Sequence, residues 1–278
     1  MQQNNAIPSN FVFDWYQATF YDVSAETMIN ALLGHYDMST AKPIKGQNSY
    51  LYGWSISRGD VCIARVFWGG VNGPYPHVIS TSDSAPGVSS FLRDNFPDHR
   101  ITRADVCEDY TGDGTWDLLY SELERFALHK GLKLSQVGDY TRGENGRTLY
   151  VGSPKSIVYL RLYEKGHESG HSDKNWVRLE IVVRPKKAKA REHFASQPPQ
   201  AFFGASAWSL ELYGHLTSLS VPRVVSGTVR APSDDEKAFQ HLISQYTNVL
   251  GRLASAKGVS FVLGQLENAI IESDNFSG

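Results

Sequence analysis

The sequence lacks several features that would place it in a restricted class of proteins. It has only two cysteines, Cys62 and Cys107, in 278 residues, too few for a disulfide framework. No apolar run approaches the roughly 20 residues that a membrane span needs. The opening stretch MQQNNAIPSN has neither the charged nor the apolar part of a secretion signal. These absences predict a globular, cytoplasmic protein without a membrane partner.

The chain also lacks an overall excess of positive charge, since its formal net charge is -2. The charge is unevenly distributed along the chain. Residues 161–191 contain nine basic and four acidic residues, whereas residues 1–41 contain four acidic residues and no lysine or arginine. A local basic face can bind phosphates even when the whole protein is close to neutral. Composition alone leaves open whether this region binds phosphate or is a solvated edge.

No two histidines are spaced His-x-His, which excludes the His-hydrophobic-His metal site found in one large class of single-strand nucleases. The segment His167 to His171 does match H-E-x-x-H, the zinc peptidase pattern, which requires a helix to place both histidines on one face. Gly166, Ser169 and Gly170 disfavour a helix, so we interpret the segment as a polar loop. A zinc peptidase remains the outside alternative.

The apolar periodicity predicts strands interleaved with helices, which is typical of an α+β fold. We expect an antiparallel-rich sheet with helices on one face, as in ferredoxin-like or RRM-like domains, and the other face free for a site. Residues 69–87 are predicted to be loop, and no internal repeat is visible. Residues 1–187 should form the functional domain and residues 188–278 a mostly helical C-terminal extension. In that extension Ser233 and Glu236 form a capping box before an amphipathic helix over residues 239–253.

The most informative stretch runs from residue 147 to residue 184 and reads as three strands, over residues 148–151, 157–164 and 176–183. Side chains alternate between the two faces of a strand. Tyr159, Arg161, Tyr163 and Lys165 should therefore share one face of the second strand. The third strand should present Arg178, Glu180 and Arg184 on one face. If these strands pair, the combined set suits phosphodiester chemistry better than packing.

Acidic residues on the predicted strands are candidates for a metal site. Asp14 lies in the strand over residues 11–21, and Asp105 and Asp109 share a face of the strand over residues 101–110. Together with Glu180 they offer only carboxylate oxygens, which favour Mg²⁺ or Mn²⁺. Tyr163 is the candidate nucleophile because Arg161 and Lys165 flank it, and a phenol needs such help at neutral pH. Tyr150 and Tyr159 are its competitors.

Four sequence pieces resemble the replication initiation factor family of rolling-circle plasmids and filamentous phages, which includes some conjugative relaxases. The pieces are a strand that opens with an aspartate, an R-x-D-x-x-x-D strand, T-x-Y-x-G-S followed by R-x-Y-x-K, and W-x-R-x-E. They span about residues 11–184. In this chain they contain, in order, FDWYQATF with Asp14; Arg103, Asp105 and Asp109; Thr148, Tyr150, Gly152 and Ser153, then Arg161, Tyr163 and Lys165; and Trp176, Arg178 and Glu180.

This resemblance implies a metal-dependent DNA nickase that starts rolling-circle replication. Tyr163 would attack one phosphodiester at the origin, stay joined to the 5′ phosphate and release a 3′ hydroxyl primer. The resemblance also implies origin DNA as partner, with a host helicase and a homodimer left open. The remaining roles would be charge neutralisation by Arg161, Lys165 and Arg178, and ion binding by Asp14, Asp105 and Glu180, with Asp109 as a further ligand.

The basic segment RPKKAKAR, residues 184–191, is predicted to contact DNA phosphates without reading sequence. The predicted DNA-binding residues are Lys186, Lys187, Lys189 and Arg103. Two alternatives to the replication initiator remain open: a relaxase that nicks a transfer origin, and a non-catalytic DNA-binding regulator on the same fold.

Overall fold

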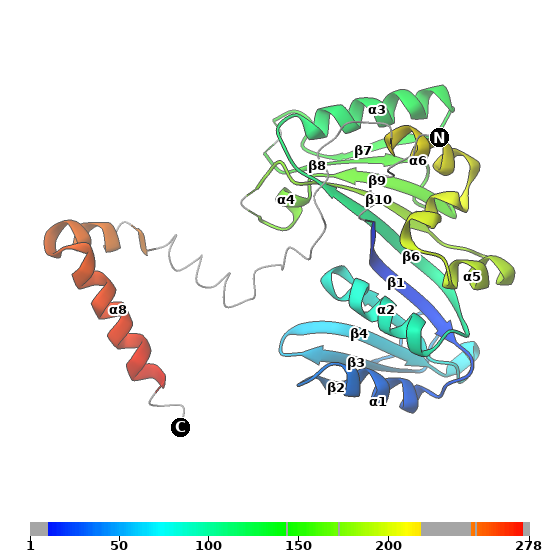
Figure 1. Ribbon diagram of the computed structural model, residues 1–278, viewed down its shortest axis with the longest axis horizontal. Coiled ribbons are helices and arrows are strands. Elements are labelled where there is room, and N and C mark those ends of the chain that lie inside the picture. Colours follow the sequence, from blue (N-terminus) through cyan, green and yellow to red (C-terminus); the bar gives the residue numbers. More distant parts are fainter. Residues whose placement is uncertain (1–10, 143, 172, 218–245, 248, 275–278) are drawn as a thin grey trace, which may run out of the picture. The chain divides into compact units, whose positions relative to one another are not determined.

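The computed structural model describes residues 11–142, 144–171, 173–217, 246–247 and 249–274 (Figure 1). The chain divides into two compact units, residues 1–229 and residues 230–278. In the second unit the structure contains the helix α8 (Val259–Asp274). The predicted capping box of Ser233 and Glu236, and the first residues of the helix predicted after it, lie outside the described residues. No helix in the described part of the chain is long and apolar enough to cross a membrane.

The first unit is built on one ten-stranded sheet in the order β2-β3-β4-β5-β1-β6-β10-β9-β8-β7. Every neighbouring pair of strands is antiparallel. The strands are β1 (Val12–Phe20), β2 (Thr40–Lys45), β3 (Tyr52–Arg58), β4 (Val61–Trp68), β5 (His77–Thr81), β6 (His99–Tyr110), β7 (Leu134–Gly138), β8 (Arg147–Val151), β9 (Val158–Tyr163) and β10 (Val177–Val183).

The sheet consists of two halves with the same element order, an internal repeat that the sequence does not reveal. The first half runs β1, α1, β2 to β5, α2, and its strands lie in the order β2-β3-β4-β5-β1. The second half runs β6, α3, β7 to β10, α5, and its strands lie in the corresponding order β7-β8-β9-β10-β6. The long strands β1 and β6 pair antiparallel where the halves meet. The repeat is therefore one of topology, with an approximate two-fold relation between β1 and β6.

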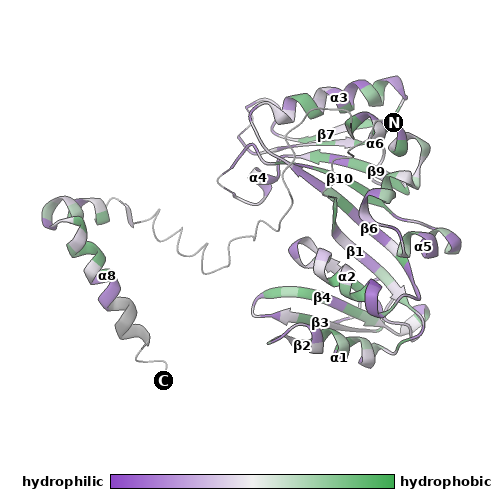
Figure 2. Cartoon of the chain, in the orientation of Figure 1, coloured by the Kyte–Doolittle hydropathy of each residue, from purple (hydrophilic) through white to green (hydrophobic). Residues whose placement is uncertain are grey.

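One hydrophobic core joins the sheet to the helices, which include α1 (Ala25–His35), α2 (Ala85–Asn95), α3 (Thr115–His129), α5 (Ala188–Ala195) and α6 (Ala207–Thr217). Leu32, Leu92, Leu123, Phe194 and Leu212 contribute to it, one from each helix. Figure 2 shows hydrophobic and hydrophilic residues alternating along α3, as expected for a helix with one face in a core. The expectation of an α+β fold with an antiparallel sheet and helices on one face is confirmed. The other face of the sheet, which we call the open face, remains for a site.

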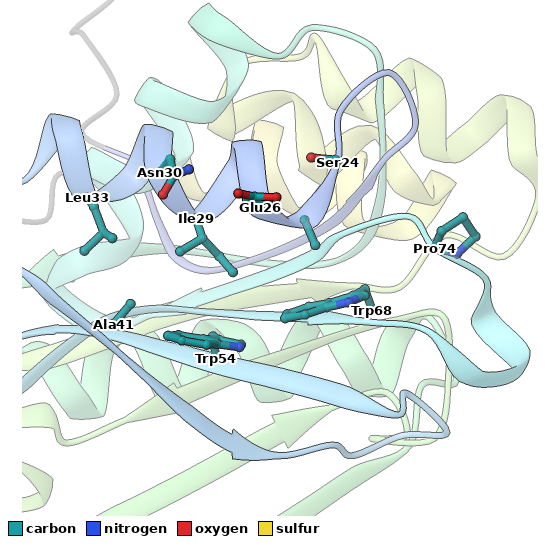
Figure 3. A pocket seen from close by; sticks show the side chains of 10 residues that line it. Ser24, Glu26, Ile29, Asn30, Leu33, Ala41, Trp54, Trp68 and Pro74 are labelled. Atoms are coloured by element: carbon teal, nitrogen blue, oxygen red, sulfur yellow. The ribbon is translucent and has the colours of Figure 1, made fainter.

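Helix α1 begins directly after Ser24, whose side chain accepts a hydrogen bond from the Thr27 N–H at 3.1 Å. A pocket remains between this helix and strands β2 to β4. Figure 3 shows the rings of Trp54 and Trp68 on its floor, with Ile29 and Leu33 reaching down from α1. This pocket is on the side of the sheet opposite the open face.

Two strands of the first half were not predicted. The expectation that residues 69–87 are loop is wrong for His77–Thr81, which forms β5 between β4 and β1. The strand has only five residues between segments rich in glycine, proline and serine, so local composition hides it. The edge strand β2 contains Pro43 and two lysines, Lys42 and Lys45, which is composition typical of an edge rather than of a buried strand.

Candidate active site

The strand register places most of the predicted site residues on the open face. On β10 and β6, Arg178 pairs with Asp109, while Glu180 lies opposite Cys107. On β9, Tyr163 lies opposite Arg178, and Arg161 lies opposite Glu180. Directly paired residues of antiparallel strands share a face. The predicted pairing of the second and third strands of residues 147–184, which are β9 and β10, is therefore confirmed. Strand β6 pairs with β10 and contributes further residues to the site.

Asp14 reaches the same face because β1 is irregular at this point. Strict alternation would place Asp14 on the face of Tyr16, which is buried in the core. The pairing of β1 with β6 shifts between Phe13 and Trp15, as in a β-bulge. A bulge redirects the side chain at the extra residue. Asp14 consequently accepts a 2.6 Å hydrogen bond from Nη1 of Arg178.

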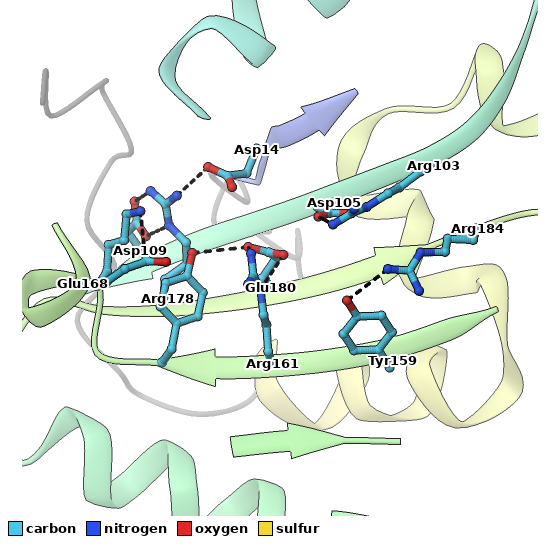
Figure 4. Close-up of polar contacts among 12 residues, drawn as sticks. Asp14, Arg103, Asp105, Asp109, Tyr159, Arg161, Glu168, Arg178, Glu180 and Arg184 are labelled. Atoms are coloured by element: carbon cyan, nitrogen blue, oxygen red, sulfur yellow. Dashed lines mark hydrogen bonds and ion pairs between the residues drawn. The ribbon is translucent and has the colours of Figure 1, made fainter. Parts of the chain in front are cut away.

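The guanidinium of Arg178 bridges two strands through two carboxylates. Its Nε and Nη2 donate to Oδ1 and Oδ2 of Asp109 at 2.6 and 2.8 Å, while its Nη1 donates to Asp14. Figure 4 shows Arg178 between Asp14 and Asp109. The Arg178 side chain is only 10% exposed, so this is a largely desolvated ion triad.

Two further arginine–carboxylate pairs lie beside this triad. Arg161 donates through Nε and Nη2 to both oxygens of Glu180, at 2.7 and 2.8 Å. Arg103 makes the same two-pronged contact with both oxygens of Asp105, at 2.8 and 2.5 Å. Planar guanidinium groups bind carboxylates and phosphates in the same bidentate manner. The arginines can therefore exchange a carboxylate for a phosphate without changing the type of contact.

Tyr163 lies within this group of charges. Its hydroxyl donates to Oε2 of Glu180 at 3.3 Å, and its side chain is 5% exposed. Burial raises the pKa of the Tyr163 phenol well above its ordinary value of 10.0, the charge of Glu180 raises it further, and Arg178 opposes the shift. Burial, together with the charges of Asp105 and Asp14, raises the pKa of Glu180 to about 7 against the opposing effect of Arg161. A carboxylate with a pKa near neutrality next to a phenol is suited to accept the phenol's proton.

The raised pKa of Glu180 predicts how stability depends on pH. Between its ordinary pKa of 4.5 and the folded value of about 7, the folded protein holds a proton that the unfolded chain has lost. Stability from this group is thus present below the unfolded pKa and is lost as the pH rises through the folded one. We expect urea unfolding to show wild-type stability falling between about pH 5 and about pH 8 relative to Glu180→Gln, which cannot titrate. Parallel pH profiles for the two proteins would contradict this assignment.

Other predicted residues are placed elsewhere. Lys165 is not on a strand face, since β9 ends at Tyr163 and Lys165 begins the one-turn helix α4 (Lys165–Glu168). Its Nζ pairs with Glu168 at 2.7 Å and lies 5.8 Å from the centre of the Tyr163 ring. Tyr159 and Tyr150, the competing tyrosines, lie on the open face of β9 and β8. Tyr159 accepts a 3.4 Å hydrogen bond from Arg184 instead of contacting Glu180.

The basic segment follows the end of β10 that is distant from Tyr163. Arg178, at the start of β10, lies opposite Tyr163, whereas the segment begins after Val183 at the other end. Lys186, Lys187 and Lys189 are exposed there, at the beginning of α5. At about 3.3 Å per residue, they lie on the order of 20 Å along the chain from Glu180. The structure does not bring them together with Tyr163, and their binding to DNA stays a prediction.

The H-E-x-x-H segment does not have the geometry of a zinc peptidase. Helix α4 ends at Glu168, and Gly170 has a positive φ of 67° between it and His171. The two histidines are therefore not held on one helix face. In the residues that the structure describes, no group of three histidine, cysteine, aspartate or glutamate side chains is arranged to hold a metal ion.

Trp15 is a site neighbour that sequence reasoning missed. Its ring lies 4.0 Å from the guanidinium carbon of Arg103, and it is opposite Asp105 in the β1–β6 pairing. The ring is half-buried. The only sequence signal is its position directly after Asp14, which becomes informative once the bulge is known. A partly exposed indole beside an arginine can stack on a nucleobase.

The donor set at the site fits a hard divalent cation in its chemistry. Asp14, Asp105 and Glu180 offer only oxygen as ligand atoms. Burial raises the pKa of Asp105 and of Glu180; the charge of Asp14 adds to both shifts, and the charge of Asp105 adds to that of Glu180. Both oxygens of Asp105 and Glu180 are, however, occupied by guanidinium groups. An ion could therefore enter only after at least one arginine had exchanged its partner.

Fold and site together define an α+β protein with an arginine- and carboxylate-rich site and a buried tyrosine on the open face of an antiparallel sheet. Residues 99–197 match the family model described as replication initiation factor. The resemblance inferred from the sequence is thereby confirmed. The matched region runs from the start of β6 to the residues just after α5, which is the second half of the repeat.

Comparison with solved structures shows the same fold in a rolling-circle replication initiator protein from Geobacillus stearothermophilus. The likeness covers 75% of this chain and 97% of that one, with 21% sequence identity and a TM-score of 0.51. DynU16, from the dynemicin biosynthetic locus, covers 73% of this chain and 99% of its own at 10% identity, but its TM-score of 0.20 carries no argument. No curated protein sequence matches the chain.

Proposed function

We propose that the protein initiates rolling-circle replication by nicking one strand of origin DNA through Tyr163. The observation that carries this proposal is the contact between the Tyr163 hydroxyl and Glu180, within a group of three arginines on the open face. The family match over residues 99–197 supports replication initiation as the process.

In the proposed reaction the Tyr163 oxygen forms a bond to the scissile phosphorus, and the bond from phosphorus to the 3′ oxygen breaks. The phenolic proton passes to Oε2 of Glu180, and the leaving 3′ oxygen takes up a proton from water. The products are a 5′-phosphotyrosine and a free 3′ hydroxyl that primes synthesis. The reverse reaction closes the strand. Arg161 and Arg178 neutralise charge that develops on the phosphate, and Lys165 adds positive charge from α4.

The same guanidinium groups determine how the site opens. Tyr163 is buried, and Arg161 and Arg178 are engaged by Glu180, Asp109 and Asp14. A phosphate offers the arginines an equivalent bidentate partner. We propose that arriving DNA draws Arg161 and Arg178 away from their carboxylates, which uncovers Tyr163 and frees Glu180 to accept its proton.

A divalent cation, Mg²⁺ or Mn²⁺, is proposed as cofactor. Asp14, Asp105 and Glu180 would hold it, with Asp109 as a further ligand, once the arginines have exchanged partners. Glu180 would bind the ion through Oε1, because Oε2 is the oxygen that contacts the Tyr163 hydroxyl. When bound, it would polarise the scissile phosphate. We expect a chelator to abolish nicking and added Mg²⁺ or Mn²⁺ to restore it. Asp105→Asn should raise the metal concentration needed for half-maximal rate. Asp113→Asn is the comparison for general charge effects, because Asp113 is exposed and accepts a hydrogen bond from Asn175 rather than from an arginine of the site. Full nicking by metal-stripped protein in chelator would exclude the cofactor.

The function is tested by incubating the protein with supercoiled plasmid that carries the replication origin of the protein's own replicon. We expect conversion to the open-circular form and a protein–DNA adduct that survives denaturation, with its 5′ end blocked. A plasmid with a scrambled origin should remain supercoiled. Binding to the origin without nicking would favour the non-catalytic regulator, and nicking confined to a transfer origin would favour the relaxase.

A further inference from the structure

The open face of the first half carries a row of side chains that leads toward the active site. Successive register partners across six strands share this face, opposite to core residues such as Val66 and Val78. From the sheet edge inward the row consists of Lys42 on β2, Ser55 on β3, Arg65 on β4, Ile79 on β5, Gln17 on β1 and Arg103 on β6. We call this set the basic row.

The basic row contains three cations and no acidic side chain. Lys42 is exposed and Arg65 is half-exposed. Within the part of the chain that the structure describes, neither of them lies within ion-pairing distance of a carboxylate. A cation that makes no ion pair inside the protein is available to an external anion.

The surface beside the two cations is built of small side chains. Ser55, Ser57 and Cys62 lie together there, with the Ser55 hydroxyl 3.4 Å from that of Ser57 and 3.5 Å from the Cys62 sulfur. The corresponding region of the second half is filled by large side chains such as Arg161 and Tyr163. Small residues let the extended backbone of a bound nucleic-acid strand approach the sheet. The longer side chains of Arg65 and Lys42 project from the same face.

The basic row extends from the edge of the sheet to the active site. Strands lie about 4.8 Å apart, so five steps from Lys42 to Arg103 cover roughly 24 Å. Arg103 is the residue that holds Asp105 in the active site, and Trp15 stacks against it. A strand that follows the row would thus arrive at the site beside an aromatic ring.

We propose that the basic row binds the phosphates of single-stranded DNA and guides the strand to the active site. This inference rests on the proposed function and adds a substrate-binding surface in the half that the family match does not cover. Lysine on an edge strand can also serve to prevent edge-to-edge pairing, which would account for Lys42. It does not account for Arg65, which lies on β4, two strands in from the edge.

The test compares Lys42→Gln/Arg65→Gln with the control Lys45→Gln/Lys133→Gln. The control removes the same charge, but Lys45 lies on the opposite face of β2, and Lys133 precedes β7 at the other edge of the sheet. Fluorescence anisotropy with a labelled oligothymidylate, over a range of salt concentrations, measures binding to single strands without any sequence requirement.

For the row variant we expect a salt slope shallower by about 1.4, which is 0.7 for each of two lost phosphate contacts, and affinity reduced on the order of tenfold near 0.1 M salt. The control should match the wild type. Equal losses in both variants, unchanged binding in the row variant, or a loss confined to duplex DNA would each overturn the proposal. The titration does not depend on nicking, so it remains decisive even if the origin plasmid is not cut. If nicking occurs, its rate at saturating DNA should be the same in the row variant.

Discussion

Tyr163→Phe should reduce nicking by about 10³-fold or more, since removal of a covalent nucleophile leaves only residual catalysis. The substitution removes one hydroxyl and keeps the ring, which lies 4.8 Å from the guanidinium carbon of Arg161. The lost hydrogen bond to Glu180 is long, at 3.3 Å, so the stability cost should be at most about 1 kcal/mol. Binding of uncut DNA should be preserved. The measurements are initial nicking rates and the yield of denaturation-resistant protein–DNA adduct.

Tyr159→Phe and Tyr150→Phe are the matched controls, because both tyrosines share the open face with Tyr163. Each control should retain adduct formation. If the Phe variant at position 163 formed the adduct at the wild-type rate and one of the controls did not, the nucleophile would have to be reassigned to that tyrosine. The role of Glu180 as proton acceptor would then also be wrong, because neither control tyrosine donates a hydrogen bond to Glu180 in the described residues.

Arg178→Met should cost about 3–5 kcal/mol of unfolding free energy, the usual result of removing one partner from a buried ion pair. The change leaves Asp109, which is 7% exposed, and Asp14 without the cation that neutralises them. Methionine fills a similar volume, so the loss reports the charge rather than a cavity. Urea unfolding at neutral pH measures the difference.

Arg100→Met provides the comparison for this prediction. Arg100 also pairs with a carboxylate, Glu192, but the two side chains are 35% and 47% exposed. Ion pairs between exposed side chains contribute little to stability, so Arg100→Met should cost much less unfolding free energy than Arg178→Met. A further variant, Arg178→Met/Asp109→Leu, should recover part of the loss because the uncompensated charge is gone. Similar destabilisation by Arg178→Met and Arg100→Met would show that the triad is hydrated and that the site is more open than its burial indicates.

Much of the site could be predicted because strand alternation is a local property. Arg161 and Tyr163 on one strand, and Arg178 and Glu180 on another, follow from spacing alone once the strands are recognised. The partner of each carboxylate could not be predicted in this way. The sequence predicts Asp105 and Glu180 as ligands of a metal ion, but it does not show that each also contacts an arginine. That contact depends on which strands are neighbours and in which register.

The remaining differences arise from features without a local signal. The bulge between Phe13 and Trp15 is visible only in the pairing of β1 with β6, and it reverses the face on which Asp14 lies. Strand β5 is defined by its neighbours β4 and β1 rather than by its own five residues. The repeat of the two halves is a repeat of topology, so a search for repeated sequence does not find it.

The two halves of the sheet are related by an approximate two-fold axis within a single chain. The predicted site residues are unequally distributed between them. Tyr163 and its arginines belong to the second half, and Asp14 is the one member of the predicted catalytic and metal set that the first half contributes. A symmetric homodimer brings two equivalent reactive groups to DNA and is suited to cut both strands. Under the proposed function, this two-fold scaffold carries its nucleophile, Tyr163, in the second half only, so one molecule would break one strand and leave the complementary strand continuous. A double-strand break would require a second chain.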